Sequence, residues 1–402
     1  MLSYFLIASL LTLLTHGYFA LRLLPALGPG TRARRWVRAL LLGNFILLPG
    51  TMVLTLYAAP QAAWAAVPLA HLAFADVGFC ILLAAGLGAR DAAWAVGWLV
   101  GRGAGWLGRR LRGRAPRPAP ELGAARRRLL LGGLNVAACG AAGAATAVGY
   151  GLALCQPVLR HVRLPCAGLP PGFPARGLRI AQISDLHVGP TIRRGYVEQL
   201  VATVNALAAD LIVITGDLID GYVSQLREQV EPLAALRARH GVYFVTGNHE
   251  YFYRGDQWCA ALRELGLRVL QDQHQLIEHE GARVLLIGLN DPEAAPATPR
   301  AAGLARLLAT APPAELRVLF AHRPSDVQLT AGQKIDVQLS GHLHGGQFFP
   351  LTLLVKWAEP FWAGLYRVGD LWLYVNRGAG YWGPPNRLGV RQEITLLELV
   401  SG

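Results

Sequence analysis

Seven side chains of the types that bind metal ions stand in five short blocks along the second half of the sequence. They are Asp185, His187, Asp217, Asn248, His322, His342 and His344. The first three blocks each follow an apolar run that predicts a buried strand, over residues 178–184, 211–215 and 242–246. Loops at the carboxyl ends of such strands are where an α/β scaffold places its chemistry. The sequence therefore predicts that these side chains converge at one edge of a sheet, as in a two-metal hydrolase.

The chemistry of this set indicates which metals it would hold. Imidazole and carboxylate ligands together suit Zn, Mn or Fe, whereas an all-oxygen set would indicate Mg or Ca. Only Asp185 and Asp217 bring negative charge, so two divalent cations leave the site net positive even with a bridging hydroxide. Such a site attracts an anionic phosphate and lowers the pKa of bound water. One ligand must bridge the two metals, and an aspartate with two oxygens is suited to this role.

The five blocks together resemble the calcineurin-like metallophosphoesterase superfamily. They are DLH at 185–187, GD at 216–217, GNHE at 247–250, His322 alone, and GHLH at 341–344. The longer stretches GHLHGGQ at 341–347 and RGAG at 377–380 resemble its bacterial YkuE/YaeI-type branch, of which a membrane-anchored version exists. The resemblance covers roughly residues 176–400. It implies an α/β fold, a four-layer sandwich of two facing sheets flanked by helices.

The resemblance also implies a role for each residue. One metal would be held by Asp185, His187, Asp217 and His344. The other would be held by Asp217, Asn248, His322 and His342, with Asp217 as the bridge. His249 would act as general acid toward the leaving-group oxygen, oriented by Asp220 three residues after the bridge. The implied reaction is hydrolysis of a phosphate ester by a hydroxide that bridges two divalent metals, Mn, Zn or Fe.

Some of these residues also have simpler explanations. Asp217 and Asp220 are of a type that forms ordinary turns after a strand, so neither would indicate a site by itself. Glu250 is predicted to be a hydrogen-bonding anchor for its loop rather than a catalytic residue. Asn290 and Asp291 follow another predicted strand. A turn is the favoured interpretation for this pair, and an approach to the site is the alternative.

Charge is divided unevenly along the 402-residue chain. Residues 1–166 hold 17 basic and 3 acidic residues, whereas residues 167–402 hold 21 basic and 22 acidic residues. The formal net charge of +13 therefore arises in the first part of the chain. A nucleic-acid enzyme would place basic patches on its catalytic domain, so no nucleic-acid partner is expected.

Four apolar stretches in the first part are long enough to span a bilayer, which takes about 20 residues. They run over residues 2–21, 37–59, 62–87 and 129–154. Five arginines lie in or beside the first loop between them and ten lie in the third, so the positive-inside rule places both loops in the cytoplasm. The protein would then be a multi-pass protein of the cell membrane with an extracytoplasmic catalytic domain. A short apolar piece at 92–101 is predicted to be interfacial, and a fifth span there would reverse this topology.

The chain is therefore predicted to have three parts. They are a membrane region at 1–155, a linker rich in Pro and Gly at 156–176, and a metallophosphoesterase domain at 177–402. Inside the membrane region, His71 and Asp76 are predicted to form hydrogen bonds to other helices. In the last part, the apolar and aromatic segment 348–366 is predicted to pack in the core. The alternative for this segment is a lipid-facing rim.

We expect a membrane-anchored phosphoesterase that acts on a phosphodiester or pyrophosphate, with a lipid-linked substrate as one option and the bilayer as a partner. One alternative is a lipid-precursor pyrophosphatase similar to UDP-2,3-diacylglucosamine hydrolase, which requires a cytoplasmic active site. Another is a non-catalytic membrane scaffold or sensor. The presence of His249, which has no ligand role to preserve, argues against a scaffold.

Overall fold

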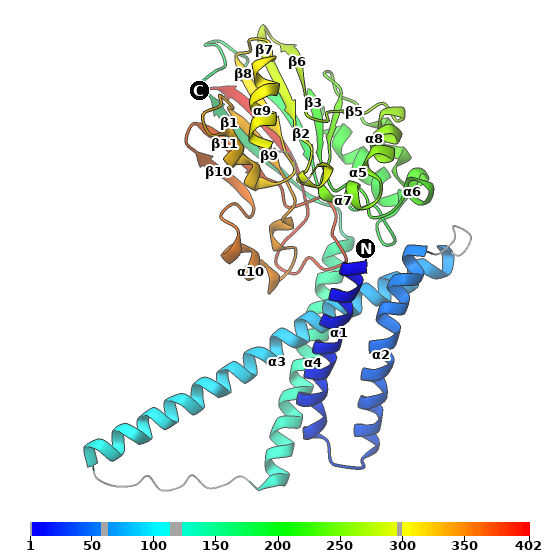
Figure 1. Ribbon diagram of the computed structural model, residues 1–402, viewed down its shortest axis with the longest axis vertical. Coiled ribbons are helices and arrows are strands. Elements are labelled where there is room, and N and C mark those ends of the chain that lie inside the picture. Colours follow the sequence, from blue (N-terminus) through cyan, green and yellow to red (C-terminus); the bar gives the residue numbers. More distant parts are fainter. Residues whose placement is uncertain (1, 58–62, 113–122, 296–299) are drawn as a thin grey trace. The chain divides into compact units, whose positions relative to one another are not determined.

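The computed structural model describes residues 2–57, 63–112, 123–295 and 300–402, and it divides into two compact units. Four helices account for the described part of the first unit. They are α1 (Leu2–Leu23), α2 (Arg32–Tyr57), α3 (Ala63–Arg112) and α4 (Ala124–Leu154) (Figure 1). Of the described residues, the second unit contains 63–67, at the start of α3, and 149–402, which begin within the last turns of α4 and include all described strands.

Two segments of the described residues are long and apolar enough to cross a membrane, Val67–Trp106 and Ala125–Leu154. Residues 2–21 lie in α1 and residues 37–57 lie in α2, but neither of these helices is among the two segments found in the described residues. Residues 58–62, at the predicted boundary between the second and third spans, lie outside the described residues. The structure thus supports two of the four predicted spans.

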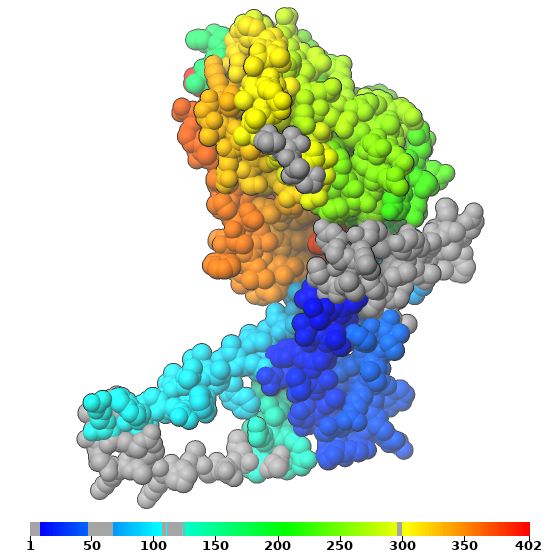
Figure 2. All heavy atoms as spheres, in the orientation of Figure 1, coloured from blue at the N-terminus to red at the C-terminus, as the bar shows by residue number. Residues whose placement is uncertain are grey.

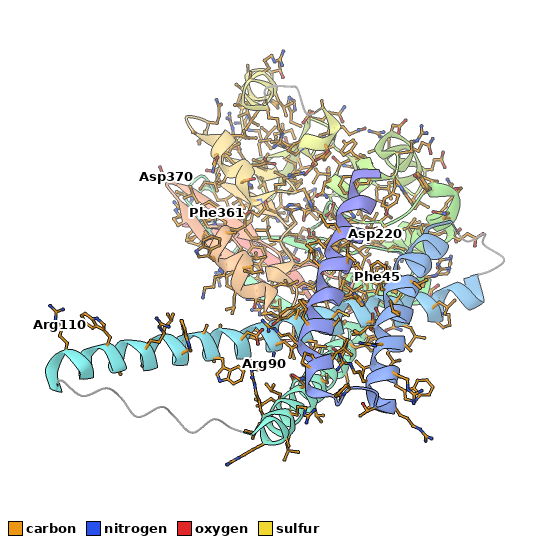
Figure 3. The ribbon with its side chains drawn as sticks, turned by 60° about the horizontal axis from the view of Figure 1, so that its bottom comes forward. Phe45, Arg90, Arg110, Asp220, Phe361 and Asp370 are labelled. Atoms are coloured by element: carbon orange, nitrogen blue, oxygen red, sulfur yellow. The ribbon has the colours of Figure 1, made fainter. Side chains whose placement is uncertain are left out.

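One of the two candidate spans belongs to a helix much longer than a membrane crossing. The 50 residues of α3 extend about 75 Å, whereas the hydrocarbon core of a bilayer is about 30 Å thick. Residues 92–101, predicted to form a separate interfacial piece, continue this helix without a break. Figure 3 shows Arg90 and Arg110 on the same helix, with Arg110 near its end. The structure therefore has one continuous helix where the sequence suggested two segments.

Polar side chains connect the first three helices. Nε2 of His16 on α1 lies 2.8 Å from Oδ1 of Asn44 on α2, and Asn44 donates a hydrogen bond of 2.6 Å to Asp76 on α3. Asp91 of α3 also pairs with Arg22 of α1 at 2.7 Å. Bonds of this kind select a partner among apolar helices, which pack with little specificity otherwise. The predicted helix-to-helix role of Asp76 is confirmed.

Two six-stranded sheets form the second unit, in the orders β1-β12-β2-β3-β4-β5 and β10-β11-β9-β8-β7-β6. The strands of the first sheet are β1 (Val158–Cys166), β2 (Leu178–Ile183), β3 (Leu211–Thr215), β4 (Val242–Val245), β5 (Arg268–Val269) and β12 (Glu393–Ser401). Those of the second are β6 (Gln273–His279), β7 (Ala282–Gly288), β8 (Leu316–Phe320), β9 (Val337–Ser340), β10 (Gly364–Val368) and β11 (Leu371–Val375).

Three apolar layers hold these sheets and their helices together. Between the sheets, Ile180 and Val213 of the first lie in one buried cluster with Leu286 and Val318 of the second. The outer face of the first sheet packs on α5 (Arg194–Ala206), α6 (Val223–Val230) and α8 (Gly255–Glu264). The outer face of the second packs on α9 (Arg300–Ala309). Figure 1 shows these helices on the outside of the two sheets, which confirms the predicted α/β sandwich.

The predicted linker at 156–176 is wrong over much of its length. Val158–Cys166 forms β1, which pairs in parallel with β12 from end to end. Leu164 and Cys166 of this strand are buried between the two sheets. Most of the Pro and Gly residues that suggested a linker follow β1 and make the turns that lead into β2. Only three residues separate α4 from β1, so the candidate span leads almost directly into the sheet.

The aromatic segment 348–366 divides between the two alternatives. Phe348 is buried, and Phe361 and Tyr366 pack against the apolar cluster outside the second sheet. Between them, α10 (Leu351–Ala358) has no buried side chain. Core packing is therefore wrong for α10, although it holds for the residues on either side.

Candidate metal centre

The strand ends bring the predicted ligands to one edge of the sandwich. β2, β3 and β4 are parallel neighbours, and Asp185, Asp217 and Asn248 lie two or three residues beyond them. In the second sheet, β8 and β9 are parallel, and His322 and His342 each lie two residues beyond their strand. Because parallel strands end at the same edge, the loops of each sheet present their side chains together.

A first group contains Asp185, His187 and His344, which could hold a metal ion among them. Nε2 of His187 lies 3.0 Å from Nε2 of His344. Nε2 of His344 in turn lies 3.5 Å from Oδ1 of Asp185. The Asp185 carboxylate also accepts hydrogen bonds of 2.9 and 3.1 Å from the backbone N–H of His342, which fixes its orientation.

A second group contains Asp217, His322 and His342, which could hold another ion. Nε2 of His322 lies 3.1 Å from Nδ1 of His342 and 3.1 Å from Oδ2 of Asp217. The same Asp217 oxygen lies 4.0 Å from Nε2 of His187 in the first group. Asp217 therefore faces both groups, as a bridging ligand would.

Asn248 supplies a direct test of whether a cation fits this site. Its Oδ1 atom is buried, and within the described part of the chain no hydrogen-bond donor meets it. A buried acceptor left without a partner costs about 1–3 kcal/mol, so such atoms usually mark a bound ion or water. Together with the imidazoles and carboxylates around it, this oxygen fits the divalent metals that the resemblance implies.

The loops that carry these side chains have unusual backbone conformations. Of the ten non-glycine residues with positive φ in the described chain, five are predicted ligands: Asp185, His187, Asp217, His342 and His344. Their φ angles lie between 50° and 74°. Positive φ costs a residue with a side chain about 1 kcal/mol or more, and it persists where the surrounding structure enforces it. The strain is therefore concentrated at the loops that carry the predicted ligands.

Two glycines in the motifs are required by close contacts with the ligands. A Cβ atom on Gly247 would lie 2.2 Å from Oδ1 of Asp217. A Cβ atom on Gly341 would lie 1.9 Å from Oγ of Ser184 and 2.2 Å from Oδ2 of Asp185. Any larger residue at either position would displace a carboxylate of the site.

Asp220 binds two histidines, whereas the sequence suggested one. Its Oδ1 atom lies 2.5 Å from Nδ1 of His249 and 3.2 Å from Nδ1 of His187. A carboxylate at Nδ1 holds the proton on that nitrogen and directs Nε2 toward the site. In His187 this leaves Nε2 as the nitrogen that faces His344. In His249 it leaves Nε2 4.0 Å from Oδ2 of Asp217.

The surrounding charges determine which imidazoles carry protons. Burial lowers the pKa of His249, but the carboxylates of Asp220 and Asp217 outweigh it and raise the pKa to about 9. His249 is therefore protonated at neutral pH. Burial and the nearby His322 cation lower the pKa of His342 to about 3, and burial with the nearby His187 holds the pKa of His344 well below its usual value. These two rings are neutral, which is the form that binds metal.

The two carboxylates of the site differ in their ionisation. Burial raises the pKa of Asp185, and the neighbouring Asp217 charge adds to this effect. Burial also opposes ionisation of Asp217, but His322 and His249 outweigh it and hold the pKa well below its usual value. In return, Asp217 raises the pKa of His322 to about 10 against the effect of burial. A metal ion would compete with this proton for the same nitrogen.

Glu250 is the loop anchor that the sequence predicted. Its carboxylate accepts hydrogen bonds from the backbone N–H groups of Gly247 at 2.6 Å, Asp217 at 3.1 Å and Leu218 at 2.8 Å. Burial raises its pKa to about 7, with the Asp217 charge adding to the shift. Glu250 thereby ties the loop after β4 to the loop after β3.

Asn290 and Asp291 reach the site only through intermediates. Asp291 caps a short helical turn at Pro292–Ala294 and pairs with Arg323, the residue after His322, at 2.7 Å. Asn290 accepts a hydrogen bond from Thr246, in the loop after β4. The favoured prediction of a turn is confirmed, and the pair contacts Arg323 and Thr246 in the loops that carry the proposed ligands.

Sequence reasoning missed two residues of the site. Trp382 is 56% exposed, and its ring lies edge-on to that of His249 with 5.7 Å between centroids. Arg387 is fully buried, with Nη2 3.1 Å from Nδ1 of His344 and Nη1 donating to the carbonyl groups of His344 and Arg377. Both follow the RGAG stretch at 377–380, so a polar or aromatic residue in the Pro- and Gly-rich loop after that motif was the available signal.

Residues 178–346 match the family model described as calcineurin-like phosphoesterase. The chain is 40% identical over 256 residues to the transmembrane protein with metallophosphoesterase domain of Bos taurus, covering 60% of this chain and 57% of that protein. It is 37% identical over 261 residues to the protein of the same name from Danio rerio, covering 62% of this chain and 59% of that protein. It is also 29% identical over 290 residues to the uncharacterized metallophosphoesterase YkuE of Bacillus subtilis, covering 69% of this chain and 98% of that protein.

The fold, the clustered ligands and these matches define the second unit as a metallophosphoesterase domain. More specifically, residues 178–346 form a calcineurin-like phosphoesterase domain, and the chain is similar to the YkuE metallophosphoesterase and to the transmembrane proteins with metallophosphoesterase domain. The alignments cover 57% and 59% of the lengths of the cattle and zebrafish relatives.

The three hydrogen bonds of Glu250 lead to a stability prediction. Glu250→Ala should lower the free energy of unfolding of the catalytic unit by about 3 kcal/mol, because three buried N–H groups lose their acceptor. Gln257→Ala, at an exposed position on the following helix, should change it by no more than about 0.5 kcal/mol. Urea unfolding of the full chain, followed by near-ultraviolet circular dichroism, measures both. Equal stability of the two variants would show that Glu250 does not anchor the loops.

Proposed function

We propose that this protein is a membrane-anchored, metal-dependent phosphoesterase that hydrolyses a phosphodiester or pyrophosphate. The observation that carries the proposal is the pair His249 and Asp220, with 2.5 Å between the ring nitrogen and the carboxylate, beside a full set of metal ligands. His249 forms a third group with His187 and Asp220 that could hold an ion, but the ligand sets implied by the resemblance leave it out. A scaffold or sensor that kept the metals for stability would have no use for this residue, so the pair favours an enzyme.

The proposed ligands divide as the two groups of side chains suggest. Asp185, His187, Asp217 and His344 would hold one ion, and Asp217, Asn248, His322 and His342 would hold the other. Mixed imidazole and carboxylate ligands suit Mn, Zn or Fe. When bound, such ions neutralise the charge on the phosphoryl group and lower the pKa of a bound water.

His249 would provide the proton for the leaving group. Its Nδ1 atom is held by Asp220, so Nε2 is the nitrogen directed toward the ligand cluster. A pKa of about 9 keeps the ring protonated at neutral pH, which allows it to protonate the departing alkoxide. Trp382 packs edge-on against the same ring.

The first unit supports the membrane anchor, and the arginine distribution supports the topology. We propose four spans, with the arginine-rich loops in the cytoplasm and the metal centre outside it. α1, α2, α3 and α4 provide a helix for each proposed span, and the segments in α3 and α4 have the length and hydropathy of spans. The alternative of a lipid-precursor pyrophosphatase similar to UDP-2,3-diacylglucosamine hydrolase requires the opposite orientation.

Removal of the proposed bridge should release metal. Asp217→Asn withdraws the one carboxylate that faces both groups, so metal content should fall below two ions per chain and turnover should fall by about a hundredfold or more. Asp272→Asn is a matched control, because Asp272 has nearly the same φ, 50° against 51°, outside the site. Metal analysis and hydrolysis of bis(p-nitrophenyl) phosphate measure the two effects. Two metals per chain and ordinary turnover in Asp217→Asn would disprove the bridge.

The general-acid role predicts a dependence on the leaving group. His249→Ala should retain both metals and lose turnover by about 10²–10⁴-fold on an alkyl phosphodiester. The loss should be smaller on bis(p-nitrophenyl) phosphate, because nitrophenolate departs without a proton. Steady-state kinetics on the two substrates, with metal analysis of the same samples, decide the question. A loss of the same size on both substrates would argue against proton donation by His249.

The topology can be measured independently of activity. A reporter fused after Gly402 should be detected outside the cytoplasm, because the opposite orientation would carry the arginine-rich loops across the membrane. Labelling of a cysteine introduced at Arg112, near the end of α3, by a membrane-impermeant reagent should require permeabilised cells. A cytoplasmic signal from the carboxyl-terminal reporter would overturn the four-span arrangement and favour the cytoplasmic lipid-precursor enzyme.

A further inference from the structure

Large apolar side chains are exposed together on α10 and just before it. The exposed fractions are 50% for Phe349, 57% for Leu353, 61% for Leu354 and 88% for Trp357. We call these four residues the apolar edge of the catalytic unit. Figures 1 and 2 show the helix that carries three of them projecting from one end of this unit. Contiguous apolar surface of this kind usually marks a binding surface or a membrane contact.

The apolar edge is held close to the end of a candidate membrane span. The backbone N–H of Phe349 donates to the carbonyl of Leu388 at 2.9 Å, and the N–H of Arg387 donates to the carbonyl of Gly149 at 3.0 Å. The side chain of Gln392 also donates to the carbonyl of Ala153 at 2.7 Å. One short segment, 387–392, therefore binds both the start of α10 and the last turns of α4.

These bonds limit how far the apolar edge can lie from the candidate span. Residues that are adjacent in sequence or joined by a backbone hydrogen bond have Cα atoms about 4–6 Å apart, so Phe349 lies within about 15 Å of Gly149. Gly149 and Ala153 belong to the candidate span Ala125–Leu154. If this span crosses a bilayer, α10 lies at the depth of the lipid head groups or close to it.

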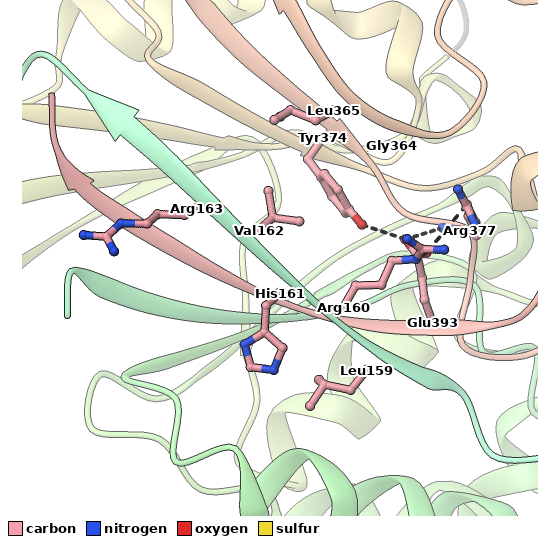
Figure 4. Close-up of a pocket in the computed structure, with 10 residues that line it drawn as sticks. All are labelled: Leu159, Arg160, His161, Val162, Arg163, Gly364, Leu365, Tyr374, Arg377 and Glu393. Atoms are coloured by element: carbon pink, nitrogen blue, oxygen red, sulfur yellow. Dashed lines mark hydrogen bonds and ion pairs between the residues drawn. The ribbon is translucent and has the colours of Figure 1, made fainter. Parts of the chain in front are cut away.

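A basic groove lies beside the same region. It is a cavity of about 610 Å³ between β1 and β10, the edge strands of the two sheets (Figure 4). Arg160 and Arg163 of β1 line it, and β1 begins three residues after α4. Buried Glu393 pairs with Arg160 at 2.7 Å and offsets the charge of that arginine. Exposed Arg163 takes no part in this ion pair. An excess of cations near the end of a span suits anionic lipid head groups.

The apolar edge is also connected to the metal centre. α10 follows the loop of His344, and Gln347 in that loop exchanges hydrogen bonds of 2.9 Å with the backbone N–H and carbonyl of Trp382. Trp382 in turn packs against His249. A molecule held at the apolar edge would therefore lie near the side of the site at which the leaving group departs.

We propose that the apolar edge docks on the surface of an anionic lipid bilayer and that the substrate is a phosphoester carried by a membrane lipid. The inference rests on the proposed phosphoesterase activity and membrane anchor, and it adds the substrate class and the surface that reaches it. Trp357, Phe349 and neighbouring Lys356 are the residue types that favour the interface between lipid and water.

A second copy of the chain is a poorer occupant for the apolar edge. A stable protein interface buries about 800 Å² on each partner and takes about 20 residues or more. The apolar edge offers four large side chains on one short helix and the residue before it. A bilayer needs no complementary shape, and a short helix with leucine and tryptophan inserts in its interface region.

The location can be tested without any enzyme assay. The full chain is reconstituted in vesicles of phosphatidylcholine and phosphatidylglycerol, with exposed Cys155 and partly exposed Cys139 replaced by serine. Leu354→Cys then carries a polarity-sensitive nitrobenzoxadiazole label, and Gln275→Cys on β6, at the opposite edge of the sheet from β10, is the matched control. Nitroxide-bearing lipids should quench the label at 354 at least about threefold more than the label at 275, because contact quenching requires burial in lipid.

The function of the surface is tested with two substrates. Leu354→Asp should lower hydrolysis of phosphatidylglycerol in the vesicles about tenfold, since loss of one buried leucine weakens lipid contact by about that factor. The same variant should hydrolyse soluble bis(p-nitrophenyl) phosphate within about twofold of the unsubstituted protein, since that substrate needs no docking. Gln275→Asp should leave both rates unchanged.

Each outcome decides between the proposals. Lipid quenching at 354 with a selective loss on phosphatidylglycerol supports docking on the bilayer. A label at 354 that stays in water overturns docking on the bilayer. A label that is protected from water only in detergent at high protein concentration also overturns it, and indicates that a second copy of the chain covers the apolar edge. Equal losses on both substrates also overturn it. Failure of the unsubstituted protein to hydrolyse either substrate would reject the phosphoesterase proposal, and the quenching result would still decide the docking.

Discussion

The buried carboxylate of Asp217 is the constraint around which the catalytic unit is arranged. Removal of this charge from water is costly unless other groups compensate for it. His322 approaches it at 3.1 Å and the backbone N–H of His249 donates to it at 2.9 Å, while Glu250 holds its own N–H group. These partners come from the loops after β8 and β4, whereas Asp217 lies in the loop after β3, so one carboxylate fixes the relative positions of three loops from both sheets.

The clustering of the proposed ligands was predictable because strand ends and residue types are both local properties of the sequence. Three apolar runs and the residues after them were enough to place Asp185, Asp217 and Asn248 at one sheet edge. The roles carried over from the family remain proposals, although the buried and unpartnered Oδ1 of Asn248 agrees with them. What local patterns could not give was the second contact of Asp220, because it depends on how the loop after β2 folds over the loop after β3.

The elements that were missed depend on partners far away in the sequence. Pro157 lies just before β1 and Pro165 lies within it, so the local sequence favours a strand only weakly. The segment becomes a strand because β12 pairs with it along its whole length. The exposed α10 has the composition of a core helix, so hydropathy alone placed it inside. Trp382 and Arg387 stand in a Pro- and Gly-rich loop whose path is set by contacts with Gln347, His344 and Gly149. For β1, Trp382 and Arg387 the deciding interaction is tertiary.

The position of β12 between β1 and β2 affects the order in which the domain can form during synthesis. About 210 residues separate the end of β2 from the start of β12, and β1 has no other strand neighbour in the described sheet. A growing chain therefore emerges with β1 and one edge of β2 unpaired until this late strand leaves the ribosome. Long-range pairing of this kind is slow, and open strand edges are prone to aggregate while they wait. Because only three residues separate β1 from the candidate span in α4, β1 stays beside that helix during this interval.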